Sequence, residues 1–231
     1  MIVLSSRILS IIEPGGVIVS EIVEVYWSFR SPYSYLVTPE LLKLREDFNV
    51  DVELRPVLPI AVRTKSTLFT NDRKPAQYII MDSFRRAEFL GMKIAFPSPD
   101  PVVQNLETFE VAEEQPYIYR LTGLGVEAQK RGKGIELAYH VSHLIWGDAP
   151  GWDQGVRLAE AVAKAGLDLA ELDASLAAND PMPAIQANHA ALEEAGHWGV
   201  PTMVFKGEPF FGQDRIETLR WRLGKAGLSR A

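Results

Sequence analysis

The sequence contains no cysteine and only four histidines among its 231 residues. The absence of cysteine excludes disulfides and any redox chemistry by thiols of the chain itself. Without cysteine, and with so few histidines, a structural zinc site is not expected, and we predict no bound metal. Any sulfur chemistry that this protein performs must therefore use a thiol supplied by another molecule.

Long apolar runs and an excess of positive charge are also missing. No stretch approaches the roughly 20 apolar residues that span a bilayer, so we expect no membrane partner. The formal net charge of −6 argues against sequence-independent binding of nucleic acid. An apolar stretch at 8–12 ends at Glu13-Pro14 and lacks the features of a signal peptide. We therefore expect a cytoplasmic protein in which residues 1–20 form a flexible extension.

A strand, a turn and a helix are predicted between residues 22 and 44. Residues 22–27 are mostly β-branched or aromatic, which indicates a buried strand, and leucines at 36, 41 and 44 recur at helical spacing. At the junction, Ser31 can accept hydrogen bonds from N–H groups at the helix start, and Pro32 suits the first helical position. Ser31 is either only an N-cap or also a hydroxyl beside a helix end that favours an anion such as a thiolate.

The order of elements along the rest of the chain predicts the fold class. A second strand at 51–58 would complete a parallel βαβ unit. No comparable strand signal follows until 202–205 and 209–211, and the intervening helices include two or three between 103 and 145 that break near Gly123 and Gly132. This order is typical of a thioredoxin-like α/β fold with a large all-helical insertion. The predicted parts are the extension 1–20, a thioredoxin-like domain over 21–60 and 180–231, and an inserted helical domain over 61–179.

Two further motifs lie at the ends of the later strands. Gly199-Val200-Pro201-Thr202 precedes the third strand, where a thioredoxin-type architecture carries a cis-proline. A cis-proline exposes the backbone of the preceding residue for pairing with an extended peptide, although a simple rigid turn is the alternative. In Phe211-Gly212-Gln213-Asp214-Arg215, Asp214 is predicted to be the N-cap of the last helix. The same segment could also hold a ligand that carries an amine and a carboxylate, such as a γ-glutamyl group.

Together the three motifs resemble those of the 2-hydroxychromene-2-carboxylate isomerases and kappa-class glutathione transferases. These are relatives of the DsbA-like oxidoreductases, and the resemblance extends over roughly residues 23–223. It implies that Ser31 hydrogen-bonds the sulfur of bound glutathione. It also implies that Val200, beside Pro201, pairs with the cysteinyl part of glutathione, and that Gln213 and Asp214 hold the γ-glutamyl end.

The resemblance also implies a reaction. The thiolate of bound glutathione adds reversibly to a conjugated carbon of the hydroxychromene carboxylate, the ring opens, a bond rotates and the thiolate is expelled. The partners would be glutathione and a small aromatic carboxylate, and a homodimer stays open. A kappa-class transferase that releases a glutathione conjugate is one alternative, and a non-catalytic thiol-peptide binder is another. Trp27, Tyr33 and Tyr35 could line a site for a flat substrate or belong to the core.

The sequence departs from the family pattern at three places. Ser28 stands where an acidic residue is usual, and Arg30 stands where an apolar residue is usual. Arg30 would lower the pKa of a bound thiol if it pointed inward, but it could instead extend into solvent. Lys74 lies in a divergent stretch at 64–78, one place out of register with the family's ligand-binding lysine. We include Lys74 among the residues expected to bind glutathione.

Overall fold

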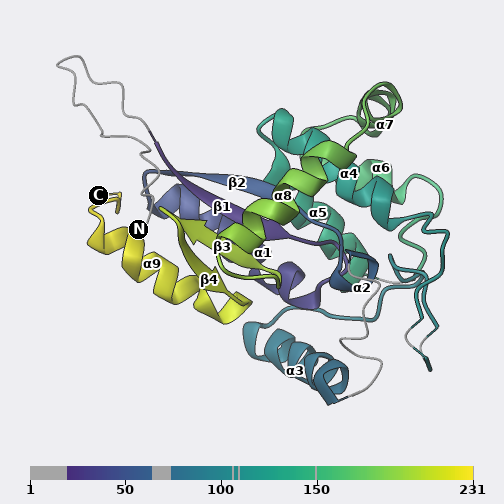
Figure 1. The fold of residues 1–231 in the computed structure, drawn as a ribbon, viewed down its shortest axis with the longest axis horizontal. Helices are drawn as coiled ribbons and strands as arrows, with labels where there is room; N and C mark the ends of the chain where they lie inside the picture. Colours follow the sequence, from purple (N-terminus) through teal and green to yellow (C-terminus); the bar gives the residue numbers. More distant parts are fainter. Residues whose placement is uncertain (1–19, 64–73, 106, 109, 149, 231) are drawn as a thin grey trace, which may run out of the picture.

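The centre of the molecule is a four-stranded sheet in the order β2-β1-β3-β4 (Figure 1). The computed structural model describes residues 20–63, 74–105, 107–108, 110–148 and 150–230, so residues 1–19 of the predicted extension lie outside it. The elements are β1 (Glu21–Trp27), α1 (Pro32–Asp47), β2 (Val50–Pro56), α2 (Ile60–Arg63), α3 (Lys74–Leu90), α4 (Ile118–Lys130), α5 (Gly134–Gly147), α6 (Arg157–Lys164), α7 (Leu169–Ala178), α8 (Met182–Glu194), β3 (Thr202–Phe205), β4 (Glu208–Phe211), the 3₁₀ turn η1 (Gln213–Arg215) and α9 (Ile216–Lys225).

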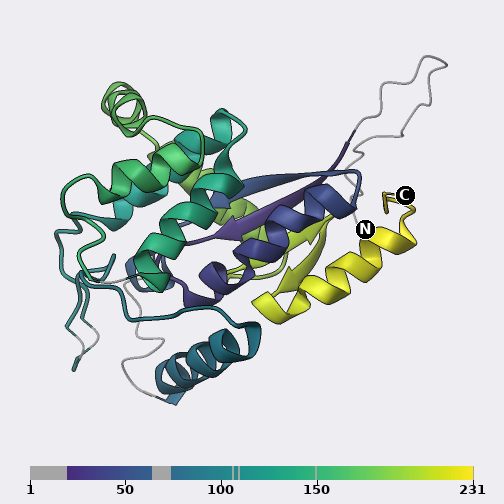
Figure 2. The same cartoon turned by 180° about the vertical axis from the view of Figure 1, so that it is seen from behind.

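The sheet combines one parallel and two antiparallel pairings. β1 runs parallel to β2, with Val23 opposite Val52, and antiparallel to β3, with Val25 opposite Met203. β3 and β4 form a short antiparallel pair. Helix α8 covers one face of the sheet, and α1 and α9 cover the other, as the two opposite views show (Figures 1 and 2). The βαβ unit and the late antiparallel return that the sequence predicted are both confirmed.

The helices between β2 and β3 differ in two respects from the prediction. Residues 110–117 are not helical, and α4 begins only at Ile118. The helix then passes through Gly123 and Gly125 without the expected break. A Cβ at Gly125 would lie 2.9 Å from the ring of Pro56 in β2, and a Cβ at Gly123 would lie 2.9 Å from a methyl group of Leu176. These glycines therefore allow α4 to pack closely against its neighbours, which compensates for their low helix propensity.

One hydrophobic core joins the sheet to the helices inserted after it. The core contains Trp27 and Leu54 from the sheet, Leu41 from α1, and Leu124 and Leu137 from α4 and α5, all at most 1% exposed. Continuous burial of this kind is the main favourable contribution to folding. The inserted helices and the sheet are thus packed as one unit.

Helix α3 lies at the margin of this unit, away from the sheet in both cartoon views (Figures 1 and 2). Only Ser83 and Ala87 of its residues are buried. Several of its apolar side chains are exposed, among them Phe89 at 76%. The helix therefore meets the rest of the molecule along one narrow face.

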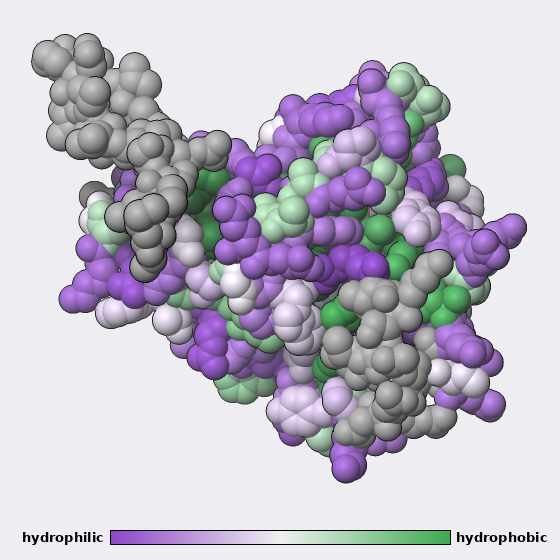
Figure 3. Space-filling model, in the orientation of Figure 1, coloured by the Kyte–Doolittle hydropathy of each residue, from purple (hydrophilic) through white to green (hydrophobic). Residues whose placement is uncertain are grey.

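The described part of the chain has neither a membrane-spanning helix nor a cluster of metal-binding side chains. None of the helices within the described ranges is long and apolar enough to cross a bilayer. Across the same ranges, no group of three or more His, Asp or Glu side chains is placed to hold a metal ion. On the face seen in Figure 3, hydrophilic residues predominate among the coloured ones, and apolar residues form separate patches.

Candidate functional site

Ser31 is the N-cap of α1, as the sequence predicted. Its backbone is extended, with φ −89° and ψ 120°, and its Oγ accepts a hydrogen bond from the Ser34 N–H at 3.2 Å. Pro32 occupies the first helical position, and the first turn of the helix contains no acidic residue. The free N–H groups and the macrodipole at this end of a 16-residue helix favour a negative charge beside Ser31.

A cis-proline loop lies across this helix end. The Val200–Pro201 peptide bond is cis, as predicted, and the Ser31 hydroxyl donates to the Val200 carbonyl at 3.4 Å. Gly199 is required here because a Cβ on it would lie 2.5 Å from the ring of Phe211. The Thr202 hydroxyl stabilises the loop by donating to the Gly199 carbonyl at 2.8 Å. The first two motifs are therefore in direct contact.

The third motif is joined to the cis-proline loop by a backbone hydrogen bond from the Gly212 N–H to the Pro201 carbonyl at 2.9 Å. Gln213 is buried, at 8% exposed. The prediction that Asp214 is an N-cap is wrong, because the η1 turn precedes α9 and contains Asp214. The exposed Asp214 carboxylate lies 3.3 Å from the guanidinium group of Arg215 instead. All three motifs thus form one continuous set of contacts.

This arrangement can be compared with known proteins. The family model described as a DSBA-like thioredoxin domain matches residues 22–224. The chain belongs to this DsbA-like family. A 2-hydroxychromene-2-carboxylate isomerase from Pseudomonas putida is 24% identical over 88% of this chain and 95% of its own length.

Similar solved structures confirm the thioredoxin-like fold with inserted helices. A 2-hydroxychromene-2-carboxylate isomerase has a TM-score of 0.65 at 22% identity, covering 89% of this chain and 95% of its own. The cytosolic disulfide reductase DsbM from Pseudomonas aeruginosa, solved with GSH, has a TM-score of 0.56 at 14% identity over 88% of this chain and 99% of its own. The family resemblance that the three motifs indicated is therefore confirmed.

Arg30, an unusual residue for this family, forms an ion pair with the inserted portion. Its Nε and Nη2 donate to the two carboxylate oxygens of Asp100 at 3.0 and 2.8 Å. Asp100 is itself oriented by the Val102 N–H at 2.9 Å. A bidentate pair of this kind fixes the guanidinium group and neutralises most of its charge. Arg30 therefore neither points into the site as a free cation nor extends alone into solvent.

The three aromatic residues near Ser31 have different surroundings. Trp27 and Tyr35 are at most 1% exposed and belong to the core, so they do not form walls of an open site. Tyr33 is half-buried, and its hydroxyl donates to Asp82 of α3 at 2.6 Å. Burial and this hydrogen bond raise the pKa of Tyr33 well above its ordinary value. Tyr33 is therefore a neutral side chain that connects α1 to α3.

Helix α3 meets the three motifs through Asp82 and Arg86, whereas the sequence had indicated Lys74. Lys74 is exposed at the first residue of α3, eight residues before Asp82, or about 12 Å along the helix. Residues 64–73 of the divergent stretch lie outside the described residues. Arg86 donates from Nε to the side-chain oxygen of Gln213 at 3.0 Å. Its only sequence signal is that it lies beside Ala87 and one turn after Ser83, on the buried face of the helix.

Two surface cavities lie apart from this site. One, of about 270 Å³, is beside the β3–β4 turn and α9 and includes Lys206 and Arg222. The other, of about 520 Å³, lies between α4, α7 and α8 and includes Tyr119 and Met182. Neither includes a residue of the three motifs. The candidate site is therefore defined by its hydrogen-bonding groups and helix end.

Proposed function

We propose that this protein is a glutathione-dependent isomerase that acts on an aromatic carboxylate of the 2-hydroxychromene-2-carboxylate type. One observation carries the proposal: the Ser31 hydroxyl lies at the N-terminus of α1, 3.4 Å from the carbonyl before a cis-proline, in a chain without cysteine. The name of the Pseudomonas putida relative supports the choice of reaction.

The groups around Ser31 fit the chemistry of glutathione. The Ser31 Oγ already accepts from the Ser34 N–H, so its proton is available to a bound sulfur in place of the weak bond to Val200. The exposed backbone beside a cis-proline pairs with an extended peptide. In this proposal Gln213 and Asp214 bind the γ-glutamyl end, which is supported by the hydrogen bond that joins their segment to the cis-proline loop. Bound glutathione would supply the thiolate nucleophile that the chain itself lacks.

The helix end, rather than a neighbouring cation, would keep the bound thiol ionised. Arg30 is the basic side chain adjacent to Ser31 in sequence, and Asp100 neutralises it. The first turn of α1 carries no acidic residue that would oppose a thiolate. A helix N-terminus is known to lower the pKa of a thiol. In this proposal Ser31 orients the sulfur and the helix stabilises its charge.

A turnover assay with 2-hydroxychromene-2-carboxylate, with and without glutathione, tests the proposal. We expect isomerisation that requires glutathione and does not consume it. Ser31→Ala should lower kcat/KM about 100-fold, by analogy with the loss of one donor to a developing charge. Ser31→Thr, which keeps the hydroxyl, should retain most of the activity.

The matched control is Asp168→Ala, which removes the side-chain cap of the distant helix α7. Both alanine variants should lose about 1 kcal/mol of stability, but only Ser31→Ala should lose activity. Stoichiometric formation of a glutathione conjugate would instead indicate the transferase. Turnover that is independent of glutathione, or glutathione binding without turnover, would contradict the proposal.

A further inference from the structure

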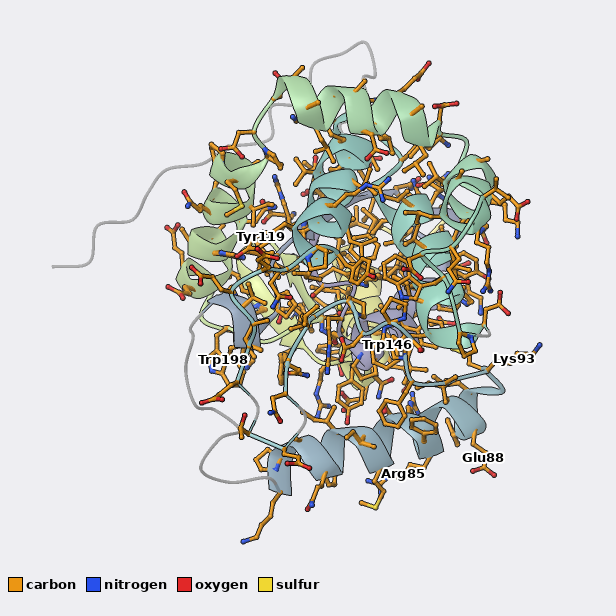
Figure 4. All side chains as sticks on the ribbon, turned by 90° about the vertical axis from the view of Figure 1, so that its right-hand side faces the viewer. Arg85, Glu88, Lys93, Tyr119, Trp146 and Trp198 are labelled. Atoms are coloured by element: carbon orange, nitrogen blue, oxygen red, sulfur yellow. The ribbon has the colours of Figure 1, made fainter. Side chains whose placement is uncertain are left out.

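Arg86 lies at the edge of the candidate site, and within the described ranges it forms no direct ion pair with a carboxylate. Most arginines in the described part of the chain form an ion pair with Asp or Glu, and Arg86 does not. It lies on the inner face of α3, between the buried Ser83 and Ala87. Its neighbours Arg85 and Glu88 lie on the exposed outer side of the helix (Figure 4). Arg86 is thus a half-buried cation facing the body of the protein.

The charge of Arg86 contributes to lowering the pKa of Asp82, but the hydrogen bonds and the ion pair of this carboxylate are made with other residues. Asp82, one turn earlier, accepts from the Tyr33 hydroxyl at 2.6 Å and from Nε of Arg85 at 2.7 Å. The Arg86 guanidinium carbon lies 4.8 Å from the ring centroid of Phe89. Its Nε donates to Gln213. The two terminal nitrogens form no ion pair with any carboxylate of the described residues.

Arg86 is connected to Ser31 through the candidate site. Its Nε contacts Gln213 at 3.0 Å, and the adjacent Gly212 N–H donates to Pro201. Val200, on the other side of the cis bond, accepts from the Ser31 hydroxyl. A ligand that extends from Ser31 along the cis-proline loop toward Gln213 would therefore reach the guanidinium group.

We infer that Arg86 binds a carboxylate of the bound ligand through its two terminal nitrogens. A guanidinium group binds carboxylates with two parallel hydrogen bonds, and a half-buried cation without a direct ion pair is stabilised when a carboxylate binds it. The inference rests on the proposed function, since both glutathione and the aromatic substrate carry carboxylates. The γ-glutamyl carboxylate and the carboxylate of the substrate are the two sources of this chemistry.

The alternative role for Arg86 is structural, as a link between α3 and η1 through Gln213. If the role is purely structural, substitution of Arg86 would weaken the binding of every ligand to the same extent. Recognition of a carboxylate would instead affect only ligands that carry that group. The test therefore compares each acid with a neutral derivative in the wild-type protein and in Arg86→Gln, which keeps a polar side chain opposite Gln213.

The first arm measures binding of glutathione and of glutathione whose γ-glutamyl α-carboxylate is an amide, by titration calorimetry. The second arm measures KM for 2-hydroxychromene-2-carboxylate and for its carboxamide at saturating glutathione. In the arm that contains the recognised group, Arg86→Gln should weaken the binding of the acid, or raise its KM, about 10- to 100-fold. The value for the neutral derivative should stay unchanged. Arg86→Lys, which keeps the charge but not the paired donors, should give an intermediate value.

Arg120→Gln is the matched control, because it removes the same charge from an arginine that Asp173 pairs on α7. It should change neither arm. The inference is overturned if Arg86→Gln weakens the binding of acid and neutral derivative equally in both arms, or weakens the binding of neither. Glutathione-dependent turnover of the wild type would then still support the proposed function. If the wild type shows no glutathione-dependent binding or turnover, both are overturned.

Discussion

Two helices meet at the candidate site, and they are held in very different ways. Helix α1 buries residues on several sides, among them Tyr35, Leu41 and Leu44, between the sheet, α5 and α9. Helix α3 is of similar length but buries only Ser83 and Ala87. Among the described residues, its link to the motifs consists chiefly of polar side-chain contacts. One helix is fixed by the core, and the other depends on a few hydrogen bonds.

This difference separates two tasks. Under the proposed function, the Ser31 hydroxyl would have to be held within about half an ångström to orient a reacting sulfur, and α1 provides a rigid support for it. Recognition of the distal parts of a ligand tolerates more adjustment, and segments that adjust are drawn from regions with few buried apolar contacts. Under the proposed function, the chemistry would therefore belong to α1 and the discrimination between ligands to α3.

The largest expected effect that tests this comparison is on stability. Leu41→Ala in α1 removes a fully buried side chain and should lower the free energy of unfolding by about 2–5 kcal/mol. Leu90→Ala in α3 removes a partly buried one and should cost about 1 kcal/mol or less. Denaturant unfolding of both variants measures the two values. Equal losses would show that α3 is as firmly packed as α1.

A smaller effect is expected when the hydrogen bond between the helices is removed. Tyr33→Phe leaves the Asp82 carboxylate without its donor from α1. The free energy of local opening of α3 should therefore fall by about 1–2 kcal/mol. Hydrogen exchange should then accelerate in α3 and stay unchanged in α1. Tyr117→Phe removes a comparable hydroxyl–carboxylate bond, to Asp153, and serves as the control. Faster exchange in both helices would contradict the assignment.

Acidification should release the same helix. Burial alone would raise the pKa of Asp82, but hydrogen bonds from Tyr33 and Arg85 and the charges of Arg85 and Arg86 outweigh it and leave the pKa below its ordinary value. A folded-state pKa below the unfolded one stabilises the protein above about pH 4. That stability is lost as the pH falls through the folded-state value. As the pH falls through the folded-state pKa of Asp82, the hydrogen-exchange rates of α3, corrected for intrinsic pH dependence, should rise before those of α1. Asp82→Asn should remove this difference in pH dependence between the two helices.

Much of the site could be predicted from local sequence, and the rest depends on contacts between distant segments. Ser31-Pro32 is a local signal for a helix start, which predicted the N-cap. The cis bond before Pro201 was expected from the predicted thioredoxin-like order of elements, because few X–Pro bonds are cis. The roles of Gly125 and Arg86 depend on partners that are distant along the chain, Pro56 and Gln213. Packing geometry, which local patterns do not encode, decided these cases.

The smallest expected effect concerns Arg30, which precedes Ser31 at the start of α1. If Asp100 neutralises Arg30, the helix end alone sets the pKa of a bound glutathione thiol. Arg30→Gln should then change that pKa by less than about half a unit. Asp100→Asn should lower it more, because it leaves an uncompensated cation beside the sulfur. Ultraviolet thiolate absorbance of bound glutathione against pH measures both values, and a large rise in Arg30→Gln would show that the cation, rather than the helix, holds the thiolate.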